Sequence, residues 1–228
     1  MDALTERDLL SMRWRDALFA HWDVGPATVE ERLPGPLDVA TYDGRAWLGI
    51  VPFEMTDIRP RGAPVGLSFG EINLRTYVER DGRKGVYFFN LDADDPVGVP
   101  LARRFYQLPY YRASIDVTRR DGSVRFTSHR TERGAPPAHF DGTYRPSGEV
   151  RTPEPGTLEA FLVENYTFYA ASGDALYRGD IRHEPWPLQD ATLDLHSSTL
   201  FAANGFERPE SAPLVHYSAG CPVTAGLV

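Results

Sequence analysis

The fold is decided by residues 69–91, which read Phe-Gly-Glu-Ile-Asn-Leu-Arg-Thr-Tyr-Val-Glu-Arg-Asp-Gly-Arg-Lys-Gly-Val-Tyr-Phe-Phe-Asn-Leu. Polar and apolar side chains alternate over residues 71–78, which is the period of a β-strand. Asp81-Gly82 supplies the positive φ angles that close a tight turn, and Val, Tyr and Phe dominate the residues that follow. The stretch therefore predicts an antiparallel hairpin.

Similar short runs, rich in Val, Ile, Thr, Tyr and Phe, recur along the chain and predict further strands. They are Ala46–Phe53, Ser68–Val78, Gly85–Leu91, Arg112–Thr118, Val124–His129, His139–Tyr144, Ala175–Arg182 and Leu214–Ser218. Asp121-Gly122 lies between two of these runs and predicts a second hairpin turn. We expect a mostly β (α+β) protein with an antiparallel, meandering sheet and a few flanking helices.

The longest helix is expected over Thr157–Ala171, where Thr157 can cap the helix. Its apolar face would consist of Leu158, Phe161, Leu162 and Tyr169. A second helix is expected from about Pro96 to Tyr106, and a short one from Pro26. Residues 14–24 fit a strand or a helix equally well, and residues 132–157 are rich in loop-forming Gly and Pro.

Composition predicts one compact domain over residues 1–228, because 42% of the chain is hydrophobic and no repeat is visible. A net charge of -8 argues against a nucleic-acid partner, since phosphate binding needs basic patches. The chain lacks an apolar run of 18 residues and a secretory leader, which favours a cytoplasmic protein without a membrane partner. Cys221 is the single cysteine and is expected to be a small buried residue.

The alternating strand places four polar side chains on one face. They are Glu71, Asn73, Arg75 and Tyr77. This face could point to solvent, or it could line a polar pocket inside a closed barrel whose apolar outer face is covered. In the second case Arg75 could hold a carboxylate, and a buried Glu71 would have a raised pKa suited to acid or base chemistry.

Signals for a metal or a cofactor are missing. The six histidines, at positions 21, 129, 139, 183, 196 and 216, form no closely spaced ligand pair. The glycines do not match a nucleotide-binding pattern, and Gly-x-Ser-x-Gly does not occur. We therefore expect neither a metal nor a cofactor.

Seven strings in order resemble the YqjF-like family of uncharacterised proteins, from about residue 13 to residue 225. They are Phe19-Ala-His-Trp22, Asp43-Gly-Arg-Ala-Trp-Leu-Gly-Ile-Val-Pro-Phe53, Glu71-Ile-Asn-Leu-Arg-Thr-Tyr-Val78, Gly85-Val-Tyr-Phe-Phe-Asn-Leu-Asp-Ala93, Leu108-Pro-Tyr-Tyr111, His183-Glu-Pro-Trp-Pro-Leu-Gln-Asp190 and Val215-His-Tyr-Ser218. That family is similar in fold to acetoacetate decarboxylases, which implies an antiparallel β-barrel or cone with an internal cavity.

The same resemblance assigns roles to residues 102–111. Where those decarboxylases have Gly-Arg and then Phe-Pro-Lys-Lys, this chain has Ala102-Arg103 and then Leu108-Pro109-Tyr110-Tyr111. Tyr110 therefore stands at the Schiff-base position and Tyr111 at its lysine neighbour. The only lysine of the chain is Lys84, in the predicted turn, where a solvated and protonated amine is expected. The resemblance consequently does not carry Schiff-base decarboxylase activity to this chain.

We predict a barrel that binds a small anionic or carbonyl-bearing molecule. Glu71 would be the acid, base or acceptor and Tyr110 a hydrogen-bond donor, as the catalytic pair if lysine-independent chemistry occurs. The ligand contacts would be Asn73, Arg75, Arg103 and Tyr111, although only one of the two adjacent tyrosines can point into a pocket. The alternative is a non-catalytic ligand sensor or an interaction scaffold. A homodimer is a further expectation, drawn from the resemblance and from exposed sheet edges.

Overall fold

The computed structural model describes residues 10–60, 63–95, 108–172 and 175–227. The described strands are β1 (Leu10–Val24), β2 (Asp38–Val39), β3 (Ala46–Pro60), β4 (Leu67–Arg80), β5 (Arg83–Ala93), β6 (Tyr110–Arg120), β7 (Ser123–Arg130), β8 (His139–Arg151), β9 (Thr167–Ser172), β10 (Ala175–Arg182), β11 (Leu188–Ser198) and β12 (Leu214–Leu227). The described helices are α1 (Pro26–Glu30), α3 (Leu158–Val163) and α4 (Leu200–Ala203). The prediction of a mostly β fold with a few helices is confirmed.

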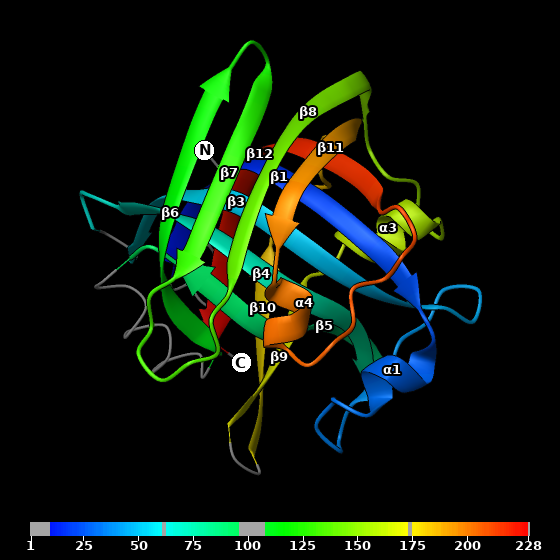
Figure 1. The fold of residues 1–228 in the computed structure, drawn as a ribbon. Helices are drawn as coiled ribbons and strands as arrows, with labels where there is room; N and C mark the ends of the chain where they lie inside the picture. Colours follow the sequence, from blue (N-terminus) through cyan, green and yellow to red (C-terminus); the bar gives the residue numbers. More distant parts are fainter. Residues whose placement is uncertain (1–9, 61–62, 96–107, 173–174, 228) are drawn as a thin grey trace.

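All the named strands belong to one sheet, and its pairings close two rings (Figure 1). Both rings share the central strands β12-β1-β3-β4-β5. On one side, β9 pairs with β5 and β10 pairs with β12, which closes the smaller ring. On the other side, β6, β7, β8 and β11 connect β5 to β12 and close the larger ring. The sheet is mainly antiparallel, but β5 is parallel to β6 and to β9.

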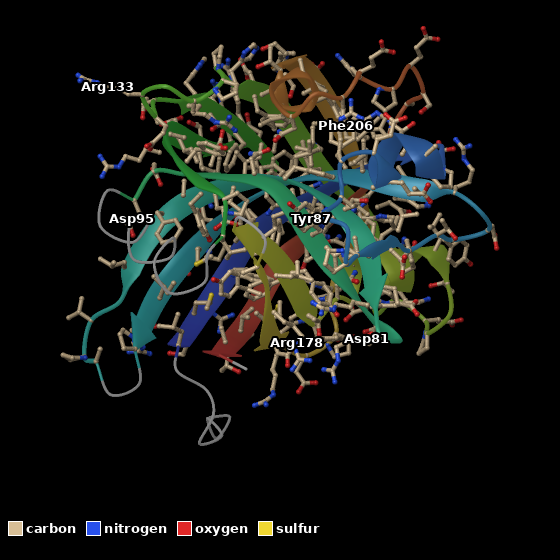
Figure 2. The ribbon with its side chains drawn as sticks, turned by 90° about the horizontal axis from the view of Figure 1, so that it is seen from below. Asp81, Tyr87, Asp95, Arg133, Arg178 and Phe206 are labelled. Atoms are coloured by element: carbon tan, nitrogen blue, oxygen red, sulfur yellow. The ribbon has the colours of Figure 1, made fainter. Side chains whose placement is uncertain are left out.

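Each ring encloses its own hydrophobic core, so the shared strands are buried on both faces. Leu48 and Leu74 face the larger ring with Phe126, whereas Phe53 faces the smaller ring with Trp186. Seen from below, Phe206 lies on one side of the shared strands and Arg178 of β10 on the other (Figure 2). Burial on both faces explains the nearly continuous apolar run of β3, a pattern otherwise typical of parallel sheets.

The two Asp-Gly turns are confirmed as tight hairpins. Asp81 and Gly82 have φ angles of 50° and 74°, and Asp121 and Gly122 have φ angles of 51° and 74°. These positive angles at both central positions match the right-handed twist of the strands that they connect. They fix the registers of β4 with β5 and of β6 with β7.

The helix predicted over Thr157–Ala171 is wrong beyond residue 163. Thr157 does cap α3, because its Oγ1 accepts a hydrogen bond from the Ala160 amide at 3.3 Å. The helix ends at Val163, and residues from Thr167 onward form β9, which pairs with β10 and with β5. Tyr169 therefore lies on a strand and not on the helix face, because sheet pairing outweighs the local periodicity.

The remaining local predictions have mixed outcomes. The helix at Pro26 is confirmed as α1, with Pro in its first turn, and the undecided residues 14–24 belong to β1. The loop-rich zone 132–157 contains the whole of β8. The helix predicted from Pro96 to Tyr106 lies outside the described residues.

Candidate functional site

The polar face of β4 points into the smaller ring and not toward solvent. Glu71, Asn73 and Tyr77 are buried, with exposed fractions of 2%, 3% and 1%. Arg75 is partly buried on the same face. The apolar alternate residues, Ile72 and Leu74, face the core of the larger ring. Of the two interpretations that the alternation leaves open, the structure shows the one in which the polar face points into the ring.

Glu71 and Tyr110 form a buried hydrogen-bonded pair. The Tyr110 hydroxyl donates to Glu71 Oε2 at 2.7 Å, and the Asn73 amide donates to Glu71 Oε1 at 3.5 Å. The pair is assembled across β5, because Leu91 is in register with both Asn73 of β4 and Tyr110 of β6. The acid and the phenol therefore lie on the same wall.

Burial raises the pKa of Glu71 to about 7, and the charge of Asp92 acts in the same direction. The hydrogen bonds from Tyr110 and Asn73 lower this pKa but do not offset burial. A carboxyl group with such a pKa can donate or accept a proton near neutral pH. Glu71 is thus a buried carboxyl group whose pKa lies near neutrality.

A second polar group occupies the other end of the same face. The Tyr77 hydroxyl lies 2.6 Å from His21 Nε2 and 2.7 Å from the Leu162 carbonyl oxygen of α3. The Arg75 guanidinium donates to the same carbonyl at 3.1 Å and to the Tyr77 hydroxyl at 3.5 Å. Arg75 and Tyr77 are thereby fixed beneath α3. His21 had no predicted role, since its partners are distant in sequence.

Tyr111 lies on the opposite face from Tyr110. The Arg130 guanidinium carbon is 4.0 Å from the centroid of the Tyr111 ring, and Arg130 also forms a buried ion pair with Asp92 at 2.8 Å. Tyr111 is therefore part of a different cluster from Glu71. Arg103, the other predicted anion contact, lies outside the described residues. Lys84 is exposed at the start of β5.

One group of described residues brings three possible metal-ligand atoms close together. Glu159, Asp190 and His216 each offer one such atom, and these atoms lie within 4.8 Å of one another. The Arg151 guanidinium contacts both carboxylates, Glu159 at 2.5 Å and Asp190 at 2.6 Å. A cationic side chain thus already balances their charge, so the donor set does not call for a metal ion. Sequence spacing could not reveal this group, because its three members come from three separate elements.

The arrangement of the strands places this protein in the fold class of the acetoacetate decarboxylase-like proteins. The enduracididine biosynthesis enzyme MppR, in a structure complexed with pyruvate, aligns with a TM-score of 0.63 and 13% identity over 99% of this chain and 90% of that chain. Acetoacetate decarboxylase from Legionella pneumophila aligns with a TM-score of 0.65 and 11% identity over 100% and 91% of the two chains. At these identities the likeness is one of fold.

Within that class, the chain belongs to the DUF2071 family, described as an uncharacterized conserved protein, whose pattern matches residues 11–222. It is 38% identical over 213 residues to the uncharacterized protein YqjF of Bacillus subtilis strain 168, which covers 92% of this chain and 87% of that protein. The predicted resemblance is confirmed. In the described residues no helix has the length and apolar character needed to cross a membrane.

Proposed function

We propose that the smaller ring binds a small carboxylic acid that also carries a carbonyl or hydroxyl oxygen. The observation that carries this proposal is the buried pair of Glu71 and Tyr110, 2.7 Å apart. With a pKa of about 7, Glu71 is substantially protonated at neutral pH and can donate to a ligand oxygen. Because one hydrogen lies between Glu71 and Tyr110, the pair offers that oxygen one further hydrogen, from the protonated Glu71 or from the Tyr110 hydroxyl.

The charge of the polar face suits an anionic ligand. When Glu71 is neutral, the remaining full charge on the face is the cation of Arg75, whose side chain is largely enclosed. Asn73 adds an amide between the two ends. One neighbour of the same fold, MppR, is complexed with pyruvate, a molecule of the proposed class. The predicted contact from Arg103 remains part of the proposal.

The proposed chemistry does not involve an amine. The sequence has a tyrosine where the related decarboxylases have their Schiff-base lysine, and its one lysine is exposed. Glu71 would act as the acid or base on a ligand polarised by Tyr110, with no covalent intermediate.

Calorimetric titration of the full chain with pyruvate and with acetoacetate tests the binding step. We expect saturable binding that is roughly tenfold weaker in Tyr110→Phe, because one hydrogen bond is lost. Tyr177→Phe is the matched control, since Tyr177 is 43% exposed on β10 and should leave the affinity unchanged. Failure of both acids to bind, or equal affinity in Tyr110→Phe, would contradict the proposal.

One observation favours the second function, a ligand sensor without turnover. Much of the smaller ring is filled by apolar side chains, among them Phe19, Phe53 and Trp186. Such a core leaves the polar face as a recognition surface with little room for solvent. Thermal stabilisation by a bound acid, with no consumption of that acid over a long incubation, would indicate a sensor. Consumption that is abolished in Glu71→Gln would indicate an enzyme.

A further inference from the structure

Two histidines lie inside the smaller ring and outside the site proposed above. His21 and His216 have exposed fractions of 0% and 2%. His216 of β12 is in register with Phe19 of β1, and His21 follows two residues later on the same face. Diagonal neighbours on paired strands are close enough for aromatic side chains to meet. The two imidazoles therefore lie on the same wall, and His216 acts electrostatically on the pKa of His21.

The proton of His216 is placed by Glu159. His216 Nε2 lies 3.2 Å from Glu159 Oε1, and hydrogen bonds from Arg151 keep the pKa of Glu159 below its ordinary value. An ionised carboxylate only accepts, so Nε2 carries the hydrogen of this bond. Burial lowers the pKa of His216, which favours the neutral ring. Its Nδ1 is consequently an acceptor lone pair.

Tyr77 likewise determines which ring nitrogen of His21 carries the hydrogen. The Leu162 carbonyl can only accept, so the Tyr77 hydroxyl donates to it at 2.7 Å and receives the hydrogen of His21 Nε2 at 2.6 Å. Burial and the charge of Arg75 lower the pKa of His21 well below its ordinary value. His21 thus also presents Nδ1 as an acceptor.

Gly49 leaves the room in which the His21 ring lies beside the Arg75 side chain. A Cβ atom on Gly49 would lie 2.8 Å from His21 Cδ2 and 3.5 Å from Arg75 Cγ, so the imidazole and the base of the Arg75 side chain pack over its backbone. Arg75 Nε is buried, and so are His21 Nδ1 and His216 Nδ1. Among the described residues, none of these three atoms has a hydrogen-bond partner. The same wall thus carries one hydrogen-bond donor, Arg75 Nε, and two acceptors, the Nδ1 atoms of the two histidines, that have no partner among the described residues.

We propose that His21, His216 and Arg75 form a second binding site, which takes a neutral hydroxyl group. The hydroxyl hydrogen goes to an imidazole Nδ1, and the oxygen accepts from Arg75 Nε. The Arg75 charge disfavours a cation, and two lone pairs disfavour an anion. A water molecule and the hydroxyl of a small alcohol or sugar share this chemistry. Arg75 is shared with the polar face described above, but this site uses its Nε and does not depend on the function proposed for Glu71.

Long-range ¹⁵N–¹H correlation spectra of the histidine-labelled full chain at neutral pH test the site. We expect both rings to carry their hydrogen on Nε2, with at least one of the two Nδ1 resonances displaced from that of a free lone-pair nitrogen by an accepted hydrogen bond. A hydrogen on Nδ1 in either ring, or two Nδ1 resonances at the free position, would overturn the proposal. Cross-relaxation from the ring protons to the water resonance identifies water. Contacts to carbon-bound protons, with a compound released on denaturation, identify an organic hydroxyl.

A variant adds a second readout. His216→Asn removes the His216 Nδ1 that competes for the hydroxyl hydrogen, and we expect the His21 Nδ1 resonance to move further from the free position. The matched control is His196→Asn, because His196 lies on β11 with 41% of its side chain exposed. An unchanged His21 resonance in His216→Asn would refute a shared site. If His216→Asn does not fold, the spectra of the unmodified chain still decide between the outcomes.

Discussion

Glu71 receives hydrogen bonds from two side chains, yet its pKa is raised to about 7 because burial outweighs both. The pKa of Glu71 therefore reflects its burial inside the smaller ring. A group whose pKa is higher in the folded chain than in the unfolded chain binds a proton more tightly when folded. The free energy of unfolding must therefore fall as the pH rises from the ordinary pKa of Glu71, 4.5, through its raised pKa of about 7.

We predict that Glu71→Gln removes this pH dependence. In the wild-type chain the contribution of Glu71 is complete below its ordinary pKa of 4.5 and is lost as the pH rises through about 7. The stability of the wild type relative to Glu71→Gln should fall by about 3 kcal/mol between pH 4 and pH 8. Urea unfolding of both proteins measures this difference, and taking the difference cancels the opposite effect of the buried histidines. Parallel curves for the two proteins would show that folding does not shift the pKa of Glu71.

Alternation along the strand revealed at the sequence level that Glu71, Asn73, Arg75 and Tyr77 share a face. It could not say whether this polar face is buried, because burial depends on the strands that close the smaller ring. His21, Glu159 and His216 could not be grouped from the sequence, since β1, α3 and β12 meet only in the folded chain. Closely spaced residues in the sequence reveal a cluster only when its members share one helix or strand. The members of this cluster are brought together by the packing of separate elements.

At the scale of elements, the parallel contact between β5 and β6 is reinforced by a buried ion pair. Asp92 of β5 and Arg130 of β7 have side chains that are 1% and 2% exposed, and Arg130 also covers the ring of Tyr111 of β6. Three strands are thus held at one point. Because the pair is enclosed, removal of one partner leaves an uncompensated charge in the interior.

We predict that Arg130→Leu lowers the free energy of unfolding by about 3 to 5 kcal/mol. The double variant Asp92→Asn with Arg130→Leu should recover part of this loss, since no unpaired charge then remains. Arg125→Leu is the control, because Arg125 lies on the same strand and pairs with Asp141 where its side chain is 57% exposed. That change should have an effect below about 1 kcal/mol. Equal effects in both single variants would contradict the assignment.

Gly49 of β3 lies between His21 of β1 and Arg75 of β4, and both side chains pack over it. His21 Cδ2 would lie 2.8 Å from a Cβ atom at this position, and the ring is fully buried and bonded to Tyr77. We predict that Gly49→Ala destabilises the chain by about 1 to 3 kcal/mol through overpacking. Thermal unfolding measures the effect. Gly35→Ala is the control, because nothing lies within 4 Å of a Cβ atom there, and its effect should stay below about 1 kcal/mol.

Elements with strong local signals were predictable, and those that depend on distant pairing were not. Asp81-Gly82 and Asp121-Gly122 specified their turns because few other residues adopt two successive positive φ angles. The run Thr167–Ala171 was assigned to a helix because its residues follow a helical pattern on a short scale. The partners that make it a strand, β5 and β10, cannot be read from the run itself.

For the whole molecule, the shared strands are held more firmly than the arm that closes the smaller ring. β3 pairs with β1 and with β4 along most of its length and is covered on both faces. The arm of β9 and β10 is joined to β5 by two register pairs and to β12 by four. We infer that the arm can open while the shared strands remain paired.

Native-state hydrogen exchange under mildly denaturing conditions tests this inference. We expect the amides of β9 and β10 to exchange through a sub-global opening whose free energy is smaller than that of β1 and β3. The larger ring serves as the internal comparison, because β7 is paired along its length with both β6 and β8. Opening of the arm would separate Val86 from Phe168 and give solvent access to the wall that carries Glu71 and His21. If β9 and β10 exchanged only with global unfolding, entry to the smaller ring would require another route.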